Sequence, residues 1–289
     1  MDVKTQIDKY VNENPVNYMN LLKNFDQFSI YEIQKILGNI MLYVPDKIFK
    51  YYSLTDNEEL NHKKFSTLEN KEVYLSYASD FNDIFDSSFY HYNPKSFDQY
   101  KFGYVFKKSF VEDNIRKTRL ASFSKSENNS VMWTHYAHDH HGYCVSYLTN
   151  SKSNPTLSTS LRPVQYSKER VDVTEYLVSF LKSMEKHDEH TIHKEPKISI
   201  KNSMVGWVIM FSYYIKDNAW AYEQEFRVTK HTKQPKSEYM EANPSAIYVG
   251  YRCKDKHIVR LVHIAFQLNI PIYKMEIGSN SQLVPKSIC

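Results

Sequence analysis

Two glutamates and an arginine in the segment WAYEQEFRV (220–228) have the types and spacing to do chemistry. If this segment is an extended strand, its side chains alternate between faces, so Glu223, Glu225 and Arg227 share one face. Neighbours on one face lie about 6.6–6.8 Å apart, which lets two carboxylates act on one small substrate. Such a pair orients a sugar hydroxyl, stabilises an oxocarbenium-like transition state or accepts a proton. The alternative is a solvated strand face on which Arg227 balances the glutamates.

Histidines are concentrated in a second segment, SFSKSENNSVMWTHYAHDHHG (122–142). Histidine is the commonest metal ligand, and four of them stand beside Asp139: His135, His138, His140 and His141. Their order matches neither HExxH nor another zinc pattern. The last two fall where a helix should end, and the helix dipole favours cations there. We therefore predict no metal site in this segment.

Glycine is scarce, with 6 residues in 289, whereas average usage predicts about 20. No two glycines lie closer than 28 positions, so neither a dinucleotide fingerprint nor a phosphate-cradling Walker loop is present. A nucleotide must then be held by side chains. Gly142 follows the histidine-rich segment, and we expect it to adopt a left-handed conformation at the helix C-terminus.

Composition narrows the class of protein further. The three cysteines stand apart without a CxxC pair, which argues against a zinc knuckle and a disulfide framework. The longest nearly apolar run, 205–215, is shorter than the roughly 18 residues that span a bilayer. A net charge of +4 is mild for a dedicated duplex-DNA binder, while contact with RNA or nucleotides stays open. We predict a cytoplasmic protein without membrane contact.

The elements that must position these residues follow from hydrophobic periodicity and turn residues. Residues 1–45 read as a helical N-terminal flank, too short to bury its own faces, and 46–289 as the catalytic-like domain on which it packs. Strands are predicted at 47–54, 72–78, 119–124, 143–148, 163–167, 221–230, 246–251 and 271–277, and helices at 55–68, 95–117, 130–139, 172–187, 196–216 and 255–269. Thr55 with Glu58, and Ser130, are the expected caps, and 148–160 is predicted to be a loop. The irregular interleaving predicts an α+β fold with a mixed or antiparallel sheet core.

Five separated motifs carry a family resemblance: FKYYSL (49–54), VYLSYASDFNDIFD (73–86), SFS with VMWTHYAHDHHGYCVSY (122–124 and 131–147), VQYS (164–167) and WAYEQEFRV (220–228). Together they resemble a large uncharacterised bacterial family found among phage-defence and abortive-infection genes, related to the AbiGi-type proteins. The chain departs from the family pattern at Tyr52, Ile84 and Ser122, where the family usually has arginine, proline and cysteine.

The same pattern looks like a divergent ADP-ribosyltransferase fold, as in DarT-like and other toxin transferases. Such folds bind NAD without a glycine-rich loop. The resemblance implies that Glu225 holds the ribose hydroxyl of NAD while the nicotinamide bond breaks, and that Glu223 orients the acceptor. It further implies an NAD-binding set made of Tyr51, Asn82, Asp83, Ser122, Ser124, His135, Tyr136 and Arg227, with Tyr51 and Tyr136 lining the nicotinamide pocket and the two serines supporting the ribose.

The function that this resemblance implies is an NAD-consuming ADP-ribosyltransferase toxin or effector of anti-phage defence. It would modify a nucleic acid or a protein of the host or phage, and an antitoxin or chaperone is a further candidate partner. Two alternatives stay open. One is a metal-dependent nuclease or phosphohydrolase built on Asp83, His135, His138 and Asp139. The other is a non-enzymatic sensor or interaction protein in which the paired glutamates and the histidines are structural.

Overall fold

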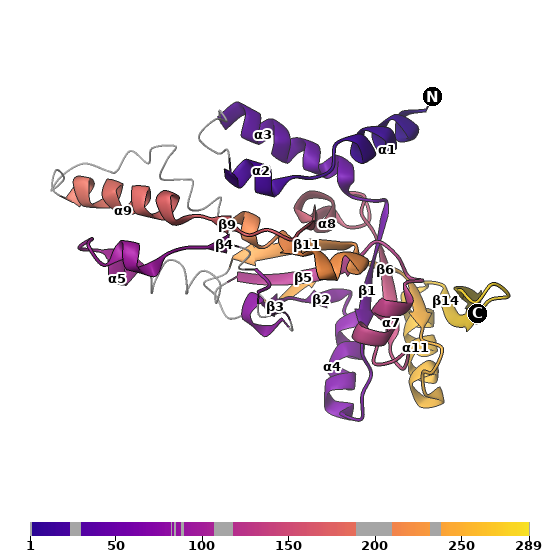
Figure 1. The fold of residues 1–289 in the computed structure, drawn as a ribbon. Coiled ribbons are helices and arrows are strands. Elements are labelled where there is room, and N and C mark those ends of the chain that lie inside the picture. The colour runs from indigo at the N-terminus through magenta and orange to yellow at the C-terminus, as the bar shows by residue number, and fades with distance from the viewer. Residues whose placement is uncertain are drawn as a thin grey trace.

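The computed structural model describes residues 2–23, 30–81, 83, 85–87, 90–106, 118–188, 210–231 and 238–288. Helices surround a central sheet (Figure 1). The α-helices are α1 (Val3–Glu13), α2 (Tyr18–Lys23), α3 (Ile30–Asn39), α4 (Glu58–Glu69), α5 (Gly103–Phe106), α7 (Ser130–Tyr136), α8 (Pro155–Ser160), α9 (Thr174–Asp188) and α11 (Asp255–Leu268). The 3-10 helices are η2 (Ile40–Tyr43), η3 (Ala78–Asp80), η4 (Pro94–Phe97) and η6 (Asn218–Glu223).

The strands are β1 (Lys47–Tyr52), β2 (Glu72–Tyr74), β3 (Ser76–Tyr77), β4 (Tyr90–His91), β5 (Thr118–Ser124), β6 (Tyr143–Leu148), β7 (Arg162–Pro163), β8 (Gln165–Ser167), β9 (Val171–Asp172), β10 (Ile215–Asp217), β11 (Glu225–His231), β12 (Tyr239–Glu241), β13 (Pro244–Val249), β14 (Ile272–Ile277) and β15 (Leu283–Ser287). Within the described ranges, nine strands form the main sheet, in the order β15-β14-β13-β6-β1-β5-β11-β7 with β3 also paired to β5. β13 and β14 run parallel, whereas the pairs around β1, β5 and β11 are antiparallel. The predicted α+β class with a mixed, mostly antiparallel sheet is confirmed.

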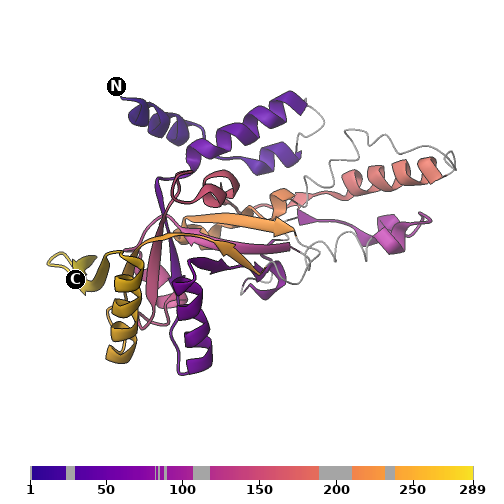
Figure 2. The same cartoon turned by 180° about the vertical axis from the view of Figure 1, so that it is seen from behind.

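The two faces of the sheet are covered by different helices. On one face, Ile48 and Val145 join a core with Phe65 of α4 and Leu261 of α11, and these two helices lie side by side in both views (Figures 1 and 2). On the other face, α7 buries Trp133. Along β5 and β11, alternate side chains such as Phe123 and Phe226 enter this first core. Because side chains alternate along a strand, the residues between them point to the opposite face, where polar residues can lie.

The N-terminal helices pack against the region that contains β7 and β8. The Tyr18 hydroxyl donates to the Pro163 carbonyl oxygen at 3.0 Å, and the Met19 amide donates to Gln165 Oε1 at 3.0 Å. Leu22 and Ile40 belong to the same buried cluster as residues of β5 and α9. The flank therefore shares its core with the rest of the chain.

Several predicted boundaries are corrected by local hydrogen bonding. α4 is capped by Asn57, whose side chain accepts from the Leu60 amide, and not by Thr55. α7 is capped by Asn129, so Ser130 is already helical. An N-cap must accept from amides two or three residues ahead, and asparagine supplies that acceptor at both helices.

Longer predicted elements differ as well. The helix predicted at 95–117 is represented by η4 and α5, and 107–117 lie outside the described residues, as does most of 196–216. The predicted loop 148–160 contains α8. β15 is absent from the prediction, and it contains Pro285. It lies at the edge of the sheet, where a proline is tolerated because its missing N–H is not needed to pair with a further strand.

The turn after α7 is built differently from the prediction. The expected left-handed conformation of Gly142 is wrong, since no described glycine has a positive φ. Instead His138, Asp139 and His140 are left-handed, with φ of 49°, 50° and 69°. Gly142 allows the turn to approach β1 closely, because a Cβ at this position would lie 2.0 Å from the carbonyl oxygen of Tyr52. The turn thereby fits directly against the end of β1.

Candidate active site

The two glutamates lie on different elements. Glu225 begins β11, whereas Glu223 ends η6, and Gln224 between them is left-handed with φ of 46°. The prediction of one strand face for all three residues is therefore corrected for Glu223 and holds for Glu225 and Arg227. The solvated strand face is also excluded as an account of this trio, because Glu223 and Glu225 are only 3% and 4% exposed and Arg227 is fully buried.

Arg227 ties Glu225 to a residue far away in sequence. Its Nε donates to Glu225 Oε1 at 2.6 Å and its NH2 to Glu225 Oε2 at 2.9 Å. The same guanidinium donates to both oxygens of Asp86, at 2.6 and 2.7 Å. A planar guanidinium with five donors suits this two-sided role. NH1 also donates to the Tyr213 carbonyl oxygen at 2.8 Å, so the side chain is fixed from three directions.

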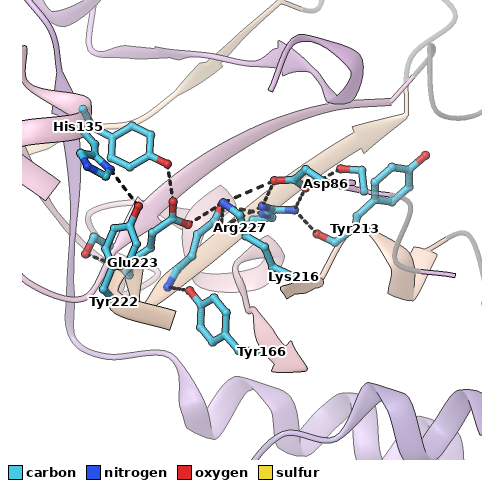
Figure 3. Close-up of polar contacts among 12 residues, drawn as sticks. Asp86, His135, Tyr166, Tyr213, Lys216, Tyr222, Glu223 and Arg227 are labelled. Atoms are coloured by element: carbon cyan, nitrogen blue, oxygen red, sulfur yellow. Dashed lines mark hydrogen bonds and ion pairs between the residues drawn. The ribbon is translucent and has the colours of Figure 1, made fainter. Parts of the chain in front are cut away.

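Lys216 connects the two glutamates (Figure 3). Its Nζ donates to Glu223 Oε2 at 2.7 Å and lies 3.5 Å from Glu225 Oε2 and 3.6 Å from Asp86 Oδ2. The residue comes from β10, which ends directly before η6. The Tyr136 hydroxyl of α7 donates to the remaining oxygen of Glu223. Three carboxylates and two cations thus form one buried network.

The network gives the two glutamates opposite protonation behaviour. Burial raises the pKa of Glu223 to about 7, and the negative charge of Glu225 acts in the same direction, against Lys216. Burial also opposes ionisation of Glu225, but the charges of Arg227 and Lys216 outweigh it and hold the pKa of Glu225 at about 2. Carboxylates whose environments separate their pKa values are suited to separate tasks, one as a fixed anion and one as a proton carrier.

A cavity of about 150 Å³ opens beside these glutamates. Six of the residues predicted for the site line it: Tyr51, Ser122, Ser124, Tyr136, Glu223 and Glu225. β5 and β11 bring the two serines to Glu225, because Glu225 pairs with Ser124 and Arg227 with Ser122 across the antiparallel ladder. Tyr51, Tyr136 and Glu223 come from β1, α7 and η6. Pockets for whole drug-sized ligands occupy about 300–1,000 Å³, whereas a cavity of about 150 Å³ accommodates a single aromatic ring such as benzene.

The two serines differ in their bonding. Ser124 Oγ donates to the Glu223 carbonyl oxygen at 2.8 Å, which fixes the start of β11. Ser122 Oγ is buried and makes no hydrogen bond of good geometry with any described residue, although its proximity helps to lower the pKa of Glu225. A buried hydroxyl without a partner is costly, so Ser122 is poised to bond a ligand in the cavity.

The aromatic walls of the cavity are held firmly. The Tyr51 hydroxyl donates to the Ser126 carbonyl oxygen at 2.7 Å, and its ring meets Trp133 edge to face at 5.2 Å. Tyr136 is fixed through Glu223. Burial and the charge of Glu223 raise the pKa of Tyr136, so this hydroxyl keeps its proton and remains a donor.

Three described residues of the predicted site do not line the cavity. Arg227 lies behind Glu225, as its contacts show. His135 is exposed on α7 and its Nδ1 lies 3.0 Å from the Tyr222 hydroxyl. Asp83 accepts from the Phe85 amide at 2.9 Å within a turn. Asn82 lies outside the described residues.

The histidines bear on the metal-dependent alternative. His138 and His141 border a separate polar cavity of about 220 Å³ together with Asp56, Lys254 and His257. In the described ranges, no three histidine, cysteine, aspartate or glutamate side chains are grouped to hold a metal ion. The alternative built on Asp83, His135, His138 and Asp139 therefore gains no support from the geometry.

Three residues of the site were absent from the sequence prediction. Asp86 is the last residue of FNDIFD (81–86). The need of a buried arginine for an acidic partner was the signal that could have pointed to it. Lys216 stands in a region predicted as helical, and no local pattern marks it. Lys50 of β1 also lines the cavity: burial lowers its pKa to about 8, Glu225 opposing, and its Nζ donates to the Ser122 carbonyl oxygen at 3.2 Å.

Among the described helices, none combines the length and apolar composition that a bilayer crossing requires. Residues 132–228 match the model of a family described as a protein of unknown function (DUF2971). No curated protein and no solved structure matches the chain. The matched region starts in α7 and ends in β11, so it contains Tyr136, Lys216, both glutamates and Arg227. Over this region, which carries both glutamates, Lys216 and Arg227 of the candidate site, the chain is similar to DUF2971 proteins.

Proposed function

We propose that this protein is an NAD-dependent ADP-ribosyltransferase-like enzyme. The observation that carries the proposal is a pair of buried carboxylates at one cavity, Glu225 ionised and Glu223 titrating near neutral pH. Transfer of ADP-ribose passes through an oxocarbenium-like ribose, which a fixed anion stabilises, and it releases a proton from the acceptor, which a second group must take. The two glutamates divide these tasks.

The chain's own residues account for binding as follows. Tyr51 and Tyr136 form the walls against which the nicotinamide ring lies, and the size of the cavity suits that ring. Ser122, whose hydroxyl makes no hydrogen bond of good geometry among the described residues, bonds the ribose. The remainder of NAD extends beyond the cavity.

The reaction balances with these groups alone. The bond between ribose C1 and the nicotinamide nitrogen breaks, its electron pair goes to that nitrogen, and neutral nicotinamide leaves. Glu225 stabilises the positive charge that develops on the ribose. A lone pair of the acceptor then forms the new bond to C1, and the acceptor's proton passes to Glu223. Lys216 and Tyr136 hold Glu223 in place for this step.

The biological setting we propose follows from the five motifs and is a toxin or effector of anti-phage defence. Its acceptor is a macromolecule of the host or the phage, and an antitoxin or chaperone is the candidate partner that restrains it. Expression of the wild type together with an inactive variant tests this setting, because growth arrest must depend on the catalytic glutamate.

The decisive experiment measures release of nicotinamide from labelled NAD by the purified protein. Wild type should release it, and Glu225→Gln should lower the rate by about 100-fold or more, in the range for loss of one preorganised electrostatic group. Glu241→Gln, a matched change at an exposed position of β12, should leave the rate unchanged. Equal rates of nicotinamide release for wild type and Glu225→Gln would contradict the proposed catalytic role of Glu225.

A further inference from the structure

A second polar cavity, of about 220 Å³, is bordered by the turn after α7 and by the start of α11. It shares no described lining residue with the cavity of the two glutamates. The charged and titratable side chains that line it are Asp56, His138, His141, Lys254 and His257. The proposed transfer reaction uses none of these five residues, so the role of this cavity is a separate question.

The walls of this second cavity are joined to one another by hydrogen bonds. The Arg252 amide donates to the His140 carbonyl oxygen at 3.0 Å, which connects the segment before α11 to the turn after α7. Lys254 Nζ donates to Asp56 Oδ1 at 2.9 Å, which connects the start of α11 to the segment between β1 and α4. Three separate segments therefore hold the cavity in shape without a ligand.

His257 is the residue of this cavity that most needs a ligand. Only 5% of its surface is exposed, and its ring packs against Phe65 at 5.9 Å but makes no hydrogen bond with any described residue. Burial lowers the pKa of His257, and of the nearby charges Glu58 raises it whereas Lys256 and Lys254 lower it. The ring is therefore neutral and carries one N–H donor. Because buried polar groups are nearly always hydrogen-bonded, a group in the cavity is the expected partner.

The charges around the cavity favour an anion. Lys254 is the N-cap of α11 and its side chain makes no capping bond, so its ammonium and the positive end of the helix dipole act on the same region. Asp56 opposes them, but its side chain is 94% exposed and is already paired with Lys254. The imidazoles here do not form a metal site, since no described side chains are grouped to hold a metal ion.

We propose that this second cavity binds a phosphate group, either free or carried by a small molecule. Lys254 supplies the charge and His257 the buried donor. His141, whose Nδ1 donates to the His138 carbonyl oxygen at 2.9 Å, gains another donor because a nearby anion favours the protonated ring. A phosphate presents several acceptor oxygens, which suits donors that arrive from separate segments. The assignment does not depend on the proposed ADP-ribosyl transfer.

The first test measures binding by isothermal titration calorimetry with two probes, inorganic phosphate and ribose 5-phosphate. A hydrogen bond to a charged group changes affinity by roughly 10-fold or more, so Lys254→Met and His257→Gln should each weaken binding of both probes by that factor. Lys286→Met, which removes an exposed lysine paired with Glu276, and His263→Gln, at an exposed position of α11, are the matched controls and should bind as wild type. Since Lys254 is about half-exposed, Lys254→Met tests the site even if His257→Gln fails to fold.

The second test uses the sign of a change at Asp56. Asp56→Asn removes the carboxylate that lines the cavity, so both probes should bind several-fold more tightly. Tighter binding of ribose 5-phosphate than of phosphate identifies a phosphoester as the ligand, and equal binding identifies free phosphate. The assignment is overturned if neither probe binds, if Asp56→Asn binds more weakly, if Lys254→Met binds as wild type, or if succinate binds as tightly as phosphate. Each of these outcomes is independent of nicotinamide release, which tests the proposed function.

Discussion

Arg227 and Asp86 form a buried bidentate ion pair across 141 positions of sequence, with NH1 to Oδ1 at 2.6 Å and NH2 to Oδ2 at 2.7 Å. Neither side chain is exposed. Because the same guanidinium also holds Glu225, this pair anchors the strand that carries the proposed catalytic anion to the segment that ends the FNDIFD motif. The position of Glu225 therefore depends on Asp86 as well as on its own strand.

Replacing Arg227 should be strongly destabilising. Arg227→Met leaves Asp86 and Glu225 buried without their main cation, although Lys216 stays close to both, and breaking a buried pair costs about 3–5 kcal/mol. Urea unfolding measures the loss. Arg260→Met, which removes a partly exposed pair with Glu69, is the control and should cost about 1 kcal/mol or less. A loss for Arg227→Met no larger than that of the control would contradict the anchoring role.

The rate of transfer should depend on the protonation of Glu223. Glu223, whose pKa is raised to about 7, accepts the acceptor's proton only when it is ionised. The rate should therefore rise as pH increases through that pKa, from about 6 to about 8. Glu223→Gln should remove this rise and lower the rate. The pH profile of single-turnover transfer tests it, and an unchanged profile in Glu223→Gln would refute a proton-accepting role.

The two glutamates should affect stability in opposite pH ranges. The folded pKa of Glu223, about 7, lies above its ordinary value of 4.5, so its contribution is complete below pH 4.5 and is lost as pH rises through 7. The folded pKa of Glu225, about 2, lies below 4.5, so its contribution is present above pH 4.5 and is lost as pH falls through 2. Urea midpoints across pH should show the first trend in wild type and lack it in Glu223→Gln.

Ser122 and Ser124 should separate activity from stability. Ser122→Ala removes a hydroxyl that makes no hydrogen bond of good geometry among the described residues and acts only weakly on Glu225, so unfolding free energy should change by less than about 0.5 kcal/mol, while the KM for NAD rises. Ser124→Ala loses the bond to the Glu223 carbonyl oxygen and should cost about 1 kcal/mol. Thermal unfolding and NAD kinetics of both variants test these roles. A larger loss of stability for Ser122→Ala than for Ser124→Ala would contradict them.

Gly142 should tolerate no side chain. Gly142→Ala places a Cβ 2.0 Å from the Tyr52 carbonyl oxygen and 3.0 Å from the Ala137 carbonyl oxygen, so backbone must move and the cost should be about 1–3 kcal/mol, as for overpacking. At Gly38 of α3, a Cβ meets no atom within 4 Å. Gly38→Ala should therefore be neutral or stabilise by up to about 1 kcal/mol. Melting temperatures of the two variants give the comparison.

Much of the sheet was predictable because its strands carry local signals. β1, β5, β6 and β14 were predicted within two residues, since alternation and β-branched or aromatic residues mark strands in any context. η6 was not predicted. WAYE has the composition of a strand, but Asp217 accepts from the Ala219 amide and begins a 3-10 turn. That local hydrogen bond outweighed the strand propensity of the aromatic residues.

The sequence by itself determined that Glu225 and Arg227 share a face, because the period of a strand is two, and that any nucleotide must be held by side chains, because glycines are too few. Only the tertiary structure decided that Asp86 and Lys216 complete the charges around them. It also decided that Glu223 and Glu225 titrate far apart. Both outcomes depend on burial and on charges brought within 4 Å of one another, with Asp86 coming from a distant segment and Lys216 from the strand before η6, and no local pattern encodes those distances.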